Sequence, residues 1–278
     1  MALRLAQASS ETTFGPTRGR LLFLHGRLCH SEMWRPLIQS LGKHFPTSWI
    51  EFPGFDKTQK DLARALSLDD MAHIVVRMVS KLPATRIVLV GHDIGGSVAL
   101  LCAKLKQELF AGLVLINPCS ILELPPEPPL GLFASAIGFR LSRLLKTQVT
   151  LPGDHKLKLT QMLNSRQSRK NWLEALVMIQ EAWPNAFERV VLRRELRSLS
   201  LPVLMLWGKH DAFNSKASCH ELVRELPDAD YFEHEGCGHW PCLEDTGWVS
   251  HKLKEFLFRV NYSRELDEPM SYRRSLSR

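Results

Sequence analysis

Short apolar runs recur along the chain and are separated by polar or glycine-rich turns. The clearest is Arg86-Ile87-Val88-Leu89-Val90, a β-branched run that stops at Gly91 and predicts a buried strand. The residues from 95 to 106 predict a helix that starts with small side chains. Similar apolar runs predict further strands at residues 21–24, 48–52, 113–116, 202–208 and 230–234.

The composition changes in the middle of the chain. Leu124-Pro125-Pro126-Glu127-Pro128-Pro129 cannot continue a strand or a helix, and from there to about Ser198 the pattern is helical. We therefore divide the chain into a core, residues 1–120 and 201–262, and a helical insertion, residues 121–200. The first nineteen residues are expected to add one or two peripheral strands, and the polar, basic residues 263–278 are expected to be a disordered tail.

Composition narrows the classes of protein. The 278 residues are 45% hydrophobic, no run is long enough to span a membrane, and residues 1–5 lack the charged-then-apolar pattern that a signal peptide would show. The six cysteines lack Cys-x-x-Cys spacing, so we expect reduced thiols and a cytoplasmic protein. Cys237, His239 and Cys242 lie close enough in sequence to suggest a metal site, but we expect no metal or other cofactor.

Positive charge is concentrated in the insertion. Residues 121–200 hold 12 Lys or Arg and 7 Asp or Glu, which gives +5 of the chain's formal +7. A solvated helix face is the simplest interpretation, and no nucleic-acid motif accompanies it. A second interpretation is that the positive charge of the insertion attracts an anionic or lipid-like substrate, or a membrane surface. The sequence says nothing about oligomeric state.

The strongest chemical signal is the stretch Gly91-His92-Asp93-Ile94-Gly95-Gly96, between the predicted strand and the predicted helix. A strand, a sharp turn and a helix form the context of a nucleophile elbow, and here the residue at the apex is Asp93. The start of a helix also favours an ionised carboxylate. A simple helix N-cap is the alternative interpretation of this aspartate.

Three further strand ends carry polar residues in a telling order. His25-Gly26-Arg27 precedes the elbow, while Lys209-His210-Asp211 and Gly238-His239-Trp240 follow it. The order nucleophile, acid, histidine resembles that of the α/β-hydrolase fold superfamily over residues 19–260, and the elbow is similar to those of epoxide hydrolases and haloalkane dehalogenases. The resemblance implies an α/β fold with a mostly parallel central sheet flanked by helices, and a helical cap inserted at 121–200.

The resemblance also implies roles for individual residues. Asp93 would be the nucleophile, Asp211 the orienting acid and His239 the base, while the backbone N–H groups of Arg27 and Ile94 would form the oxyanion hole. Each has a structural alternative: Asp211 as a cap of the helix near Ser215, and His239 as an ordinary loop histidine. Nearby, His25 is expected to support its loop and His92 to be packed.

An aspartate nucleophile suits displacement at saturated carbon, because attack on an ester carbonyl would produce a higher-energy anhydride. The expected reaction is therefore formation of an Asp93 alkyl ester from an epoxide or a halide, followed by hydrolysis with water activated by His239. The chain departs from the subgroup, however. Ile94 offers no halide donor, and Tyr231, Tyr262 and Tyr272 lie outside the expected cap.

Other side chains are candidates for the pocket. They are Trp34, Trp240 and three residues of the insertion, His155, Trp172 and Trp183, although packing is the simpler interpretation of the tryptophans. Two other functions stay open beside the alkyl-ester hydrolase of a small, largely apolar molecule. One is an ester, lactone or C–C bond hydrolase in which Asp93 or the Asp211–His239 pair works without a covalent step. The other is a catalytically silent protein that binds or senses a small ligand.

Overall fold

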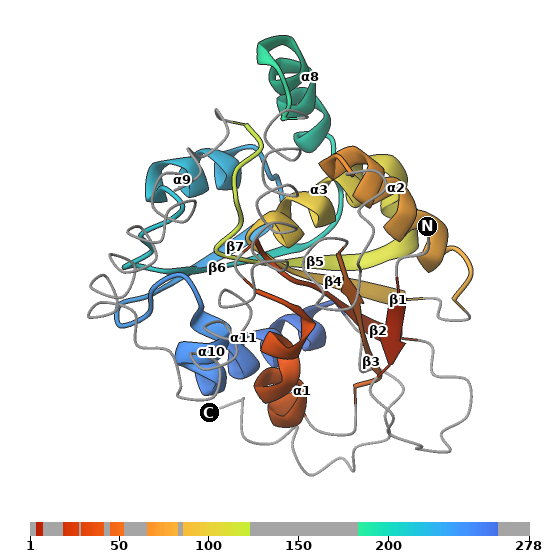
Figure 1. Cartoon of the computed structure of the whole chain (residues 1–278). Coiled ribbons are helices and arrows are strands. Elements are labelled where there is room, and N and C mark those ends of the chain that lie inside the picture. The colour runs from red at the N-terminus through yellow and green to blue at the C-terminus, as the bar shows by residue number, and fades with distance from the viewer. Residues whose placement is uncertain are drawn as a thin grey trace, which may run out of the picture.

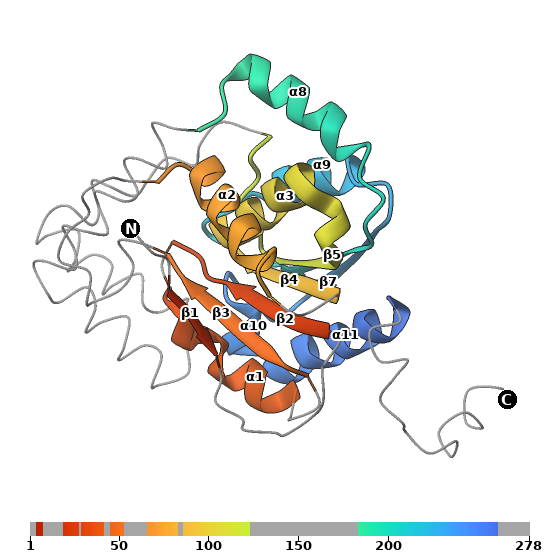
Figure 2. The ribbon, with the colours of Figure 1, turned by 90° about the vertical axis from the view of Figure 1, so that its right-hand side faces the viewer.

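A twisted sheet lies at the centre of the molecule, with helices on both of its faces (Figures 1 and 2). The computed structural model describes residues 4–7, 19–27, 29–41, 45–52, 66–82, 86–122 and 183–260. The strands are β1 (Arg4–Gln7), β2 (Gly19–Leu24), β3 (Thr47–Glu51), β4 (Arg86–His92), β5 (Phe110–Ile116), β6 (Val203–Gly208) and β7 (Ala229–His234). The helices are α1 (Arg35–Leu41), α2 (Leu68–Val79), α3 (Ile94–Lys106), α8 (Ala186–Leu196), α9 (Lys216–Arg224), α10 (Pro241–Glu244) and α11 (Thr246–Arg259), with 3₁₀ turns η1 (Ser31–Trp34) and η2 (Gln107–Leu109).

The strand order places the ends of the central strands side by side. Across the sheet it is β1-β3-β2-β4-β5-β6-β7, and only the edge strand β1 runs antiparallel to its neighbour. This confirms the predicted mostly parallel sheet. The chain moves from β2 outward to β3 and then returns to the other side of β2 to form β4. The carboxyl ends of β2 and β4 therefore flank a topological switch point, which is where open α/β sheets bind ligands.

The central strands are buried because helices cover both faces. Within β2, β4, β5 and β6 almost every residue is inaccessible to solvent, as the continuous apolar runs predict. Helices α2 and α3 pack together on one face, while α1 and α11 pack together on the other (Figure 2). Helix α3 is apolar on most of its circumference, and its residues 94–103 are all buried. The helix that carries the elbow is therefore fixed in the core.

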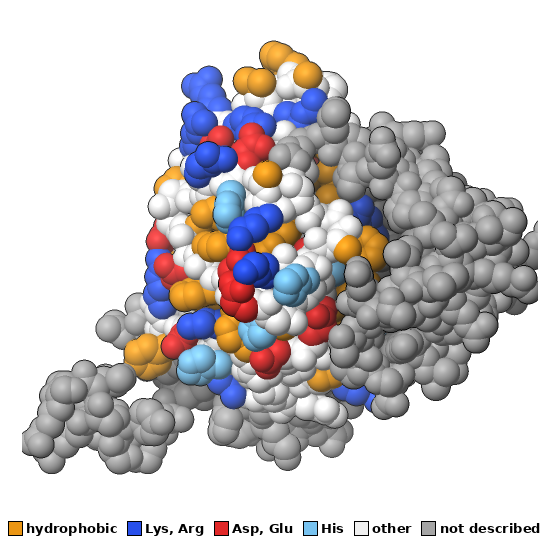
Figure 3. All heavy atoms as spheres, turned by 90° about the vertical axis from the view of Figure 1, so that its left-hand side faces the viewer, with side chains coloured by type: hydrophobic (Ala, Val, Ile, Leu, Met, Phe, Trp, Pro, Cys, Tyr) orange, Lys and Arg blue, Asp and Glu red, His pale blue; other side chains and the backbone are white. Residues whose placement is uncertain are grey.

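Most of the predicted insertion lies outside the described residues, which resume at Trp183. Helix α8 belongs to it, and Lys and Arg side chains gather around this helix beside hydrophobic ones (Figure 3). Arg193 forms an ion pair with Glu221 of α9, and Arg197 forms one with Glu225. Part of the basic face is thus occupied by ion pairs within the molecule. The predicted disordered tail, residues 263–278, also lies outside the described residues.

Two further findings bear on the predictions from composition. All six cysteines are buried free thiols. Among the described helices, none is both long enough and apolar enough to cross a membrane.

Candidate active site

The turn between β4 and α3 has the strained geometry of an elbow. Asp93 adopts φ 54° and ψ −121°, a conformation that a residue with a side chain rarely takes. Glycines make the turn possible: a Cβ on Gly91 would lie 2.4 Å from the carbonyl oxygen of Gly95, and a Cβ on Gly95 would lie 2.2 Å from that of Leu24. The close backbone approach predicted from these glycines is present, and it holds Asp93 at the apex of the turn.

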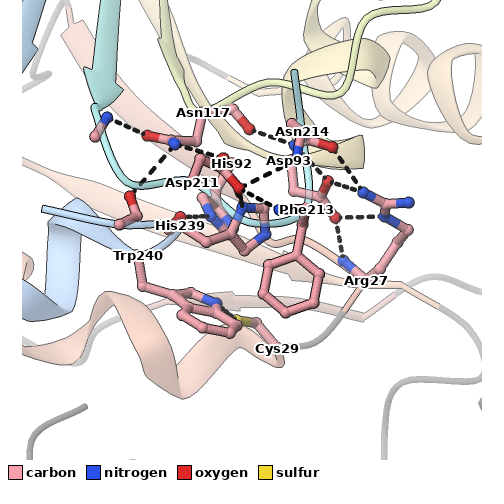
Figure 4. Close-up of polar contacts among 12 residues, drawn as sticks. Arg27, Cys29, His92, Asp93, Asn117, Asp211, Phe213, Asn214, His239 and Trp240 are labelled. Atoms are coloured by element: carbon pink, nitrogen blue, oxygen red, sulfur yellow. Dashed lines mark hydrogen bonds and ion pairs between the residues drawn. The ribbon is translucent and has the colours of Figure 1, made fainter. Parts of the chain in front are cut away.

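The Asp93 carboxylate is clamped by Arg27, from the loop after β2 (Figure 4). The Arg27 Nε donates to Oδ2 at 2.8 Å and Nη2 donates to Oδ1 at 2.7 Å, so that the guanidinium grips both oxygens. The backbone N–H of Arg27 also donates to Oδ2, at 2.8 Å. Asn214 Nδ2 donates to Oδ1 at 3.1 Å. The carboxylate thus accepts four hydrogen bonds, two at each oxygen, and its side chain is fully buried.

This clamp fixes the charge of Asp93. Burial by itself raises the pKa of a carboxyl group, but the charge and hydrogen bonds of Arg27 outweigh burial and hold the pKa of Asp93 well below its usual range. Burial lowers the pKa of Arg27, but the charge of Asp93, its hydrogen bonds and the charges of further neighbours together outweigh burial, so the pKa of Arg27 is raised above its usual range. The two side chains therefore form an ion pair in which both members stay charged and Asp93 is buried.

The source of this ionisation differs from the one expected. The sequence suggested that the N-terminus of the following helix would favour the anion. In the structure the Asp93 carboxylate makes no capping hydrogen bond to α3. The carboxylate turns instead toward the loop after β2, where a guanidinium supplies a full positive charge and a pair of aligned donors. Asp93 thus occupies the N-cap position of α3 but does not cap the helix with its side chain, and the side chain of Arg27 is the partner that the sequence analysis missed.

A second buried pair lies beside the first. Asp211, after β6, accepts from His239 Nδ1, with Oδ2 at 2.9 Å and Oδ1 at 3.1 Å. Because a carboxylate only accepts, the proton of the neutral imidazole resides on Nδ1 and leaves a lone pair on Nε2. Within the described residues, His239 Nε2 is buried without a hydrogen-bond partner. Burial raises the pKa of Asp211, but interactions with His239 reverse that effect, and the net pKa lies below the usual range.

Two asparagines that the sequence analysis missed connect these pairs. Asn117 follows β5 with φ 42°, donates to Asp211 Oδ2 at 2.6 Å and accepts the Gly208 N–H at 2.9 Å. Asn214 accepts Arg27 Nη2 at 2.9 Å, and its backbone N–H donates to Asp211 Oδ1 at 3.0 Å. Only their positions in the sequence could have indicated these asparagines. Asn117 directly follows β5, which lies between the strands that precede Asp93 and Asp211, and Asn214 follows Asp211 by three residues.

Three aromatic rings pack against the imidazole of His239. The rings of His92, Phe213 and Trp240 each have their centroid 4.8 Å from that of His239. His92 Nε2 donates to the backbone carbonyl oxygen of His239 at 2.7 Å, and burial lowers the pKa of His92 to about 4. Trp240 Nε1 donates to Cys29 Sγ at 2.9 Å. His92 therefore tethers the loop that carries His239, and the imidazole is packed among aromatic rings.

Other candidates from the sequence occupy varied places. Trp34 is fully buried in the core with its ring centroid 5.0 Å from that of Phe23. Trp183 is also buried, while His155 and Trp172 lie outside the described residues. Ile94 opens α3 directly after Asp93, where the helix leaves its first N–H groups unpaired by helical bonds. His25 supports its loop, since Nε2 accepts the N–H of Phe52 at 3.0 Å.

The polar groups do not form a metal site in the part of the chain that the structure describes, where no three His, Cys, Asp or Glu side chains are grouped suitably. His239 Nδ1 is engaged by Asp211, and the carboxylate of Asp93 by Arg27. The described site thus presents one buried carboxylate at the elbow and one histidine with an open nitrogen.

The family is shown by comparison with known proteins. Residues 19–246 match the model of the alpha/beta hydrolase fold family, and the chain belongs to that family. It is 28% identical over 253 residues to a pimeloyl-[acyl-carrier protein] methyl ester esterase from Nitrosomonas europaea, covering 86% of this chain and 95% of that protein. It is 24% identical over 260 residues to a 2-hydroxy-6-oxononadienedioate/2-hydroxy-6-oxononatrienedioate hydrolase from Paraburkholderia phymatum, covering 87% and 88%.

Solved structures agree on the fold. The enol-lactonase from Burkholderia xenovorans LB400 superposes with a TM-score of 0.71 at 16% identity, covering 92% of this chain and 95% of that one. At this identity the likeness is one of fold. The relatives support a hydrolase and give no support to epoxide hydrolase or dehalogenase specificity.

Proposed function

We propose that this protein hydrolyses a small, largely apolar alkylating molecule through an ester on Asp93, which water activated by His239 and Asp211 then cleaves. One observation carries the proposal: Asp93 Oδ2 accepts the backbone N–H of Arg27, the donor expected to form the oxyanion hole, at 2.8 Å. The carboxylate of the elbow itself thus occupies one of the two donors expected for the hole. A substrate carbonyl would need that place to be empty, whereas an ester on Asp93 needs its own oxygen to be there.

In the first step Asp93 Oδ1 forms a bond to a saturated carbon of the substrate. The bond from that carbon to its leaving atom breaks, and the electron pair departs with a halide or with the oxygen of an opened epoxide. The product is an alkyl ester, which is far more stable than the anhydride that attack on an ester carbonyl would produce. Asp93 is prepared for this step because its carboxylate stays ionised.

In the second step His239 Nε2 takes a proton from water, and the hydroxide attacks the carboxyl carbon of the Asp93 ester. Negative charge then develops on Oδ2, toward which both the N–H and the Nε–H of Arg27 point from 2.8 Å. Loss of one such donor typically costs about 3–4 kcal/mol of barrier. The ester C–O bond breaks, the alcohol leaves with the proton held by His239, and Asp93 keeps one oxygen from water.

The test uses the variant His239→Gln, which should form the ester but not cleave it. The variant is incubated with epoxides and haloalkanes, and peptide mass spectrometry measures the mass of the peptide carrying Asp93. Wild-type protein turning over in heavy-oxygen water should gain label in the same carboxylate. Asp93→Asn is the matched control and should stay unmodified in a single turnover. No adduct in His239→Gln, together with hydrolysis of esters or lactones by the wild type, would overturn the proposal.

A second candidate is an ester, lactone or C–C bond hydrolase without a covalent step. Two observations favour it. The attacking oxygen Oδ1 already accepts from Arg27 and Asn214, which weakens it as a nucleophile, and the named relatives include an esterase and a C–C type hydrolase. In that case His239 activates water directly, and heavy oxygen enters the product acid but never Asp93.

A further inference from the structure

The backbone around His239 is held by one side chain, that of Glu244 in α10. Glu244 Oε2 accepts the N–H of Gly238 at 2.6 Å, and Oε1 accepts the N–H of Trp240 at 2.9 Å. A single carboxylate thus binds the amides of both residues that flank the histidine. Neither hydrogen bond involves the imidazole, so their effect on it is exerted through the backbone.

A carboxylate is suited to this place because it offers two acceptor oxygens and no donor. Its hydrogen bonds to backbone N–H groups are charge-assisted and therefore stronger than those between neutral groups. Glu244 is also bound through its own backbone, since its N–H donates to the carbonyl oxygen of Trp240 at 2.9 Å. Hydrogen bonds in both directions join these two residues and fix the carboxylate relative to the loop.

The end of β6 restricts the same loop at Gly238. A Cβ on Gly208, the last residue of β6, would lie 2.0 Å from the carbonyl oxygen of Gly238. A Cβ on Gly238 would lie 3.4 Å from each carboxylate oxygen of Glu244. The end of β6 therefore lies against the carbonyl of Gly238 while Glu244 binds its N–H, and together they fix the backbone just before His239.

Two other contacts act on His239 itself. Asp211 accepts the ring Nδ1–H at 2.9 Å, and His92 Nε2 donates to the backbone carbonyl oxygen at 2.7 Å. Asp211 orients the ring, but the place of the open nitrogen Nε2 also depends on where the backbone carries the ring. That place matters to a base, because a displacement of about 1 Å can cost about 10²-fold in rate.

We propose that Glu244 is a positioning residue for the base, which keeps the backbone of His239 at the place from which Nε2 takes a proton from water. The inference rests on the proposed function for the role of His239, and it applies equally to the second candidate function, in which His239 also activates water. In the alkyl-ester mechanism the base acts only in the second step. Glu244 should therefore govern cleavage of the Asp93 ester and leave its formation unchanged.

The kinetic test compares Glu244→Gln and Glu244→Ala with wild type, using styrene oxide and 1-bromohexane as probes. Glutamine keeps the shape but turns one acceptor into a donor, so it loses one of the two hydrogen bonds, and alanine loses both. Mass spectrometry of the Asp93 peptide in a single turnover measures formation and cleavage of the ester. Cleavage should slow about tenfold in Glu244→Gln and about 10²-fold in Glu244→Ala, while formation stays within about twofold.

The matched control is Glu255→Gln, which removes a carboxylate from the neighbouring helix α11, where it pairs with Lys252. Both rates should stay as in the wild type. Thermal melts show that each variant is folded at the temperature of the assay.

A second measurement follows the imidazole without any substrate. Proton NMR measures how fast the Nδ1–H of His239, bound to Asp211, exchanges with water, and loss of the signal in His239→Gln assigns it. A loosened loop opens this hydrogen bond more often, so exchange should quicken by about tenfold or more in Glu244→Ala, less in Glu244→Gln and not in Glu255→Gln. A residue that served only the stability of the fold would lower the melting temperature and leave this exchange in the folded protein unchanged.

The outcomes separate the two proposals. Unchanged ester cleavage or unchanged exchange of the ring proton in folded Glu244→Ala would overturn the positioning role and leave the alkyl-ester mechanism standing. An equal loss of ester formation and cleavage would overturn it as well. No ester in any of these proteins would count against the mechanism, and the exchange of the ring proton would then decide by itself whether Glu244 positions His239.

Discussion

The site holds two buried carboxylates, and each has a different kind of partner. Asp93 is paired with a guanidinium, which is always charged, while Asp211 is paired with an imidazole, whose second ring nitrogen can accept a proton. The first pair uses every strong acceptor position of its carboxylate. The second leaves His239 Nε2 open within the described residues. In the proposed mechanism the elbow pair keeps its charges, and the histidine pair accepts a proton from water.

The largest effect is expected where the second pair is broken. In Asp211→Asn the amide can donate to His239 Nδ1, which favours the imidazole form with its proton on Nε2, where a base needs a lone pair. Turnover should fall on the order of 10³–10⁴-fold, as in other hydrolases whose orienting acid becomes an amide. The measurement is kcat on whichever substrate labels Asp93, and the Asp93 ester should accumulate as it does in His239→Gln.

The matched control for this prediction is Asp93→Asn, which should lose the ester as well as the turnover. Unchanged turnover in Asp211→Asn would mean that His239 is not the base and that the two ion pairs do not have the separate roles proposed for them.

A smaller but still large effect should appear in stability when the first pair is broken. Arg27→Met removes the cation and leaves the buried Asp93 anion without its main partner. Losing one member of a buried ion pair typically costs about 3–5 kcal/mol of the free energy of unfolding. Urea denaturation followed by circular dichroism measures the loss.

The double variant Arg27→Met/Asp93→Asn removes both charges and should recover most of that stability. If the single and the double variant were equally unstable, the cost would come from lost packing and not from an unpaired charge.

The smallest expected effect concerns His92, which lies between the two pairs. Burial lowers the pKa of His92 from 6.5 to about 4, so that between these pH values the unfolded chain binds a proton that the folded protein does not. The stability from this group is complete above pH 6.5 and is lost as the pH falls toward 4, by up to about 3 kcal/mol at about 1.4 kcal/mol per pH unit. The free energy of unfolding measured at several pH values checks this.

His92→Gln keeps a donor for the carbonyl of His239 and should flatten the slope between pH 6.5 and 4. Carboxylates with lowered pKa, such as Asp93 and Asp211, act elsewhere in the pH range. Their stabilisation is lost only as the pH falls below about 4, where unfolded aspartates begin to bind protons. An unchanged slope in His92→Gln would show that His92 is not the group responsible.

Much of the fold was predictable because its signals are local. Buried parallel strands give continuous apolar runs, and the runs at 86–90 and 202–208 lie within a residue or two of β4 and β6. The elbow was predictable for the same reason. The glycines around Asp93 are close to it in sequence, and the sharp turn requires them because a side chain at these positions would clash with nearby backbone. The order of the motifs then placed Asp211 and His239 together.

By itself, the sequence determined the strands, the elbow and the chain order of Asp93, Asp211 and His239. Only the tertiary structure decided what each of them contacts. The Arg27 guanidinium reaches Asp93 across 66 residues of chain and Asn214 reaches it across 121, because β2, β4 and β6 end at one edge of the sheet. Hydrogen bonds and ion pairs act over a few ångströms in space, and no local pattern records which distant side chain will arrive there.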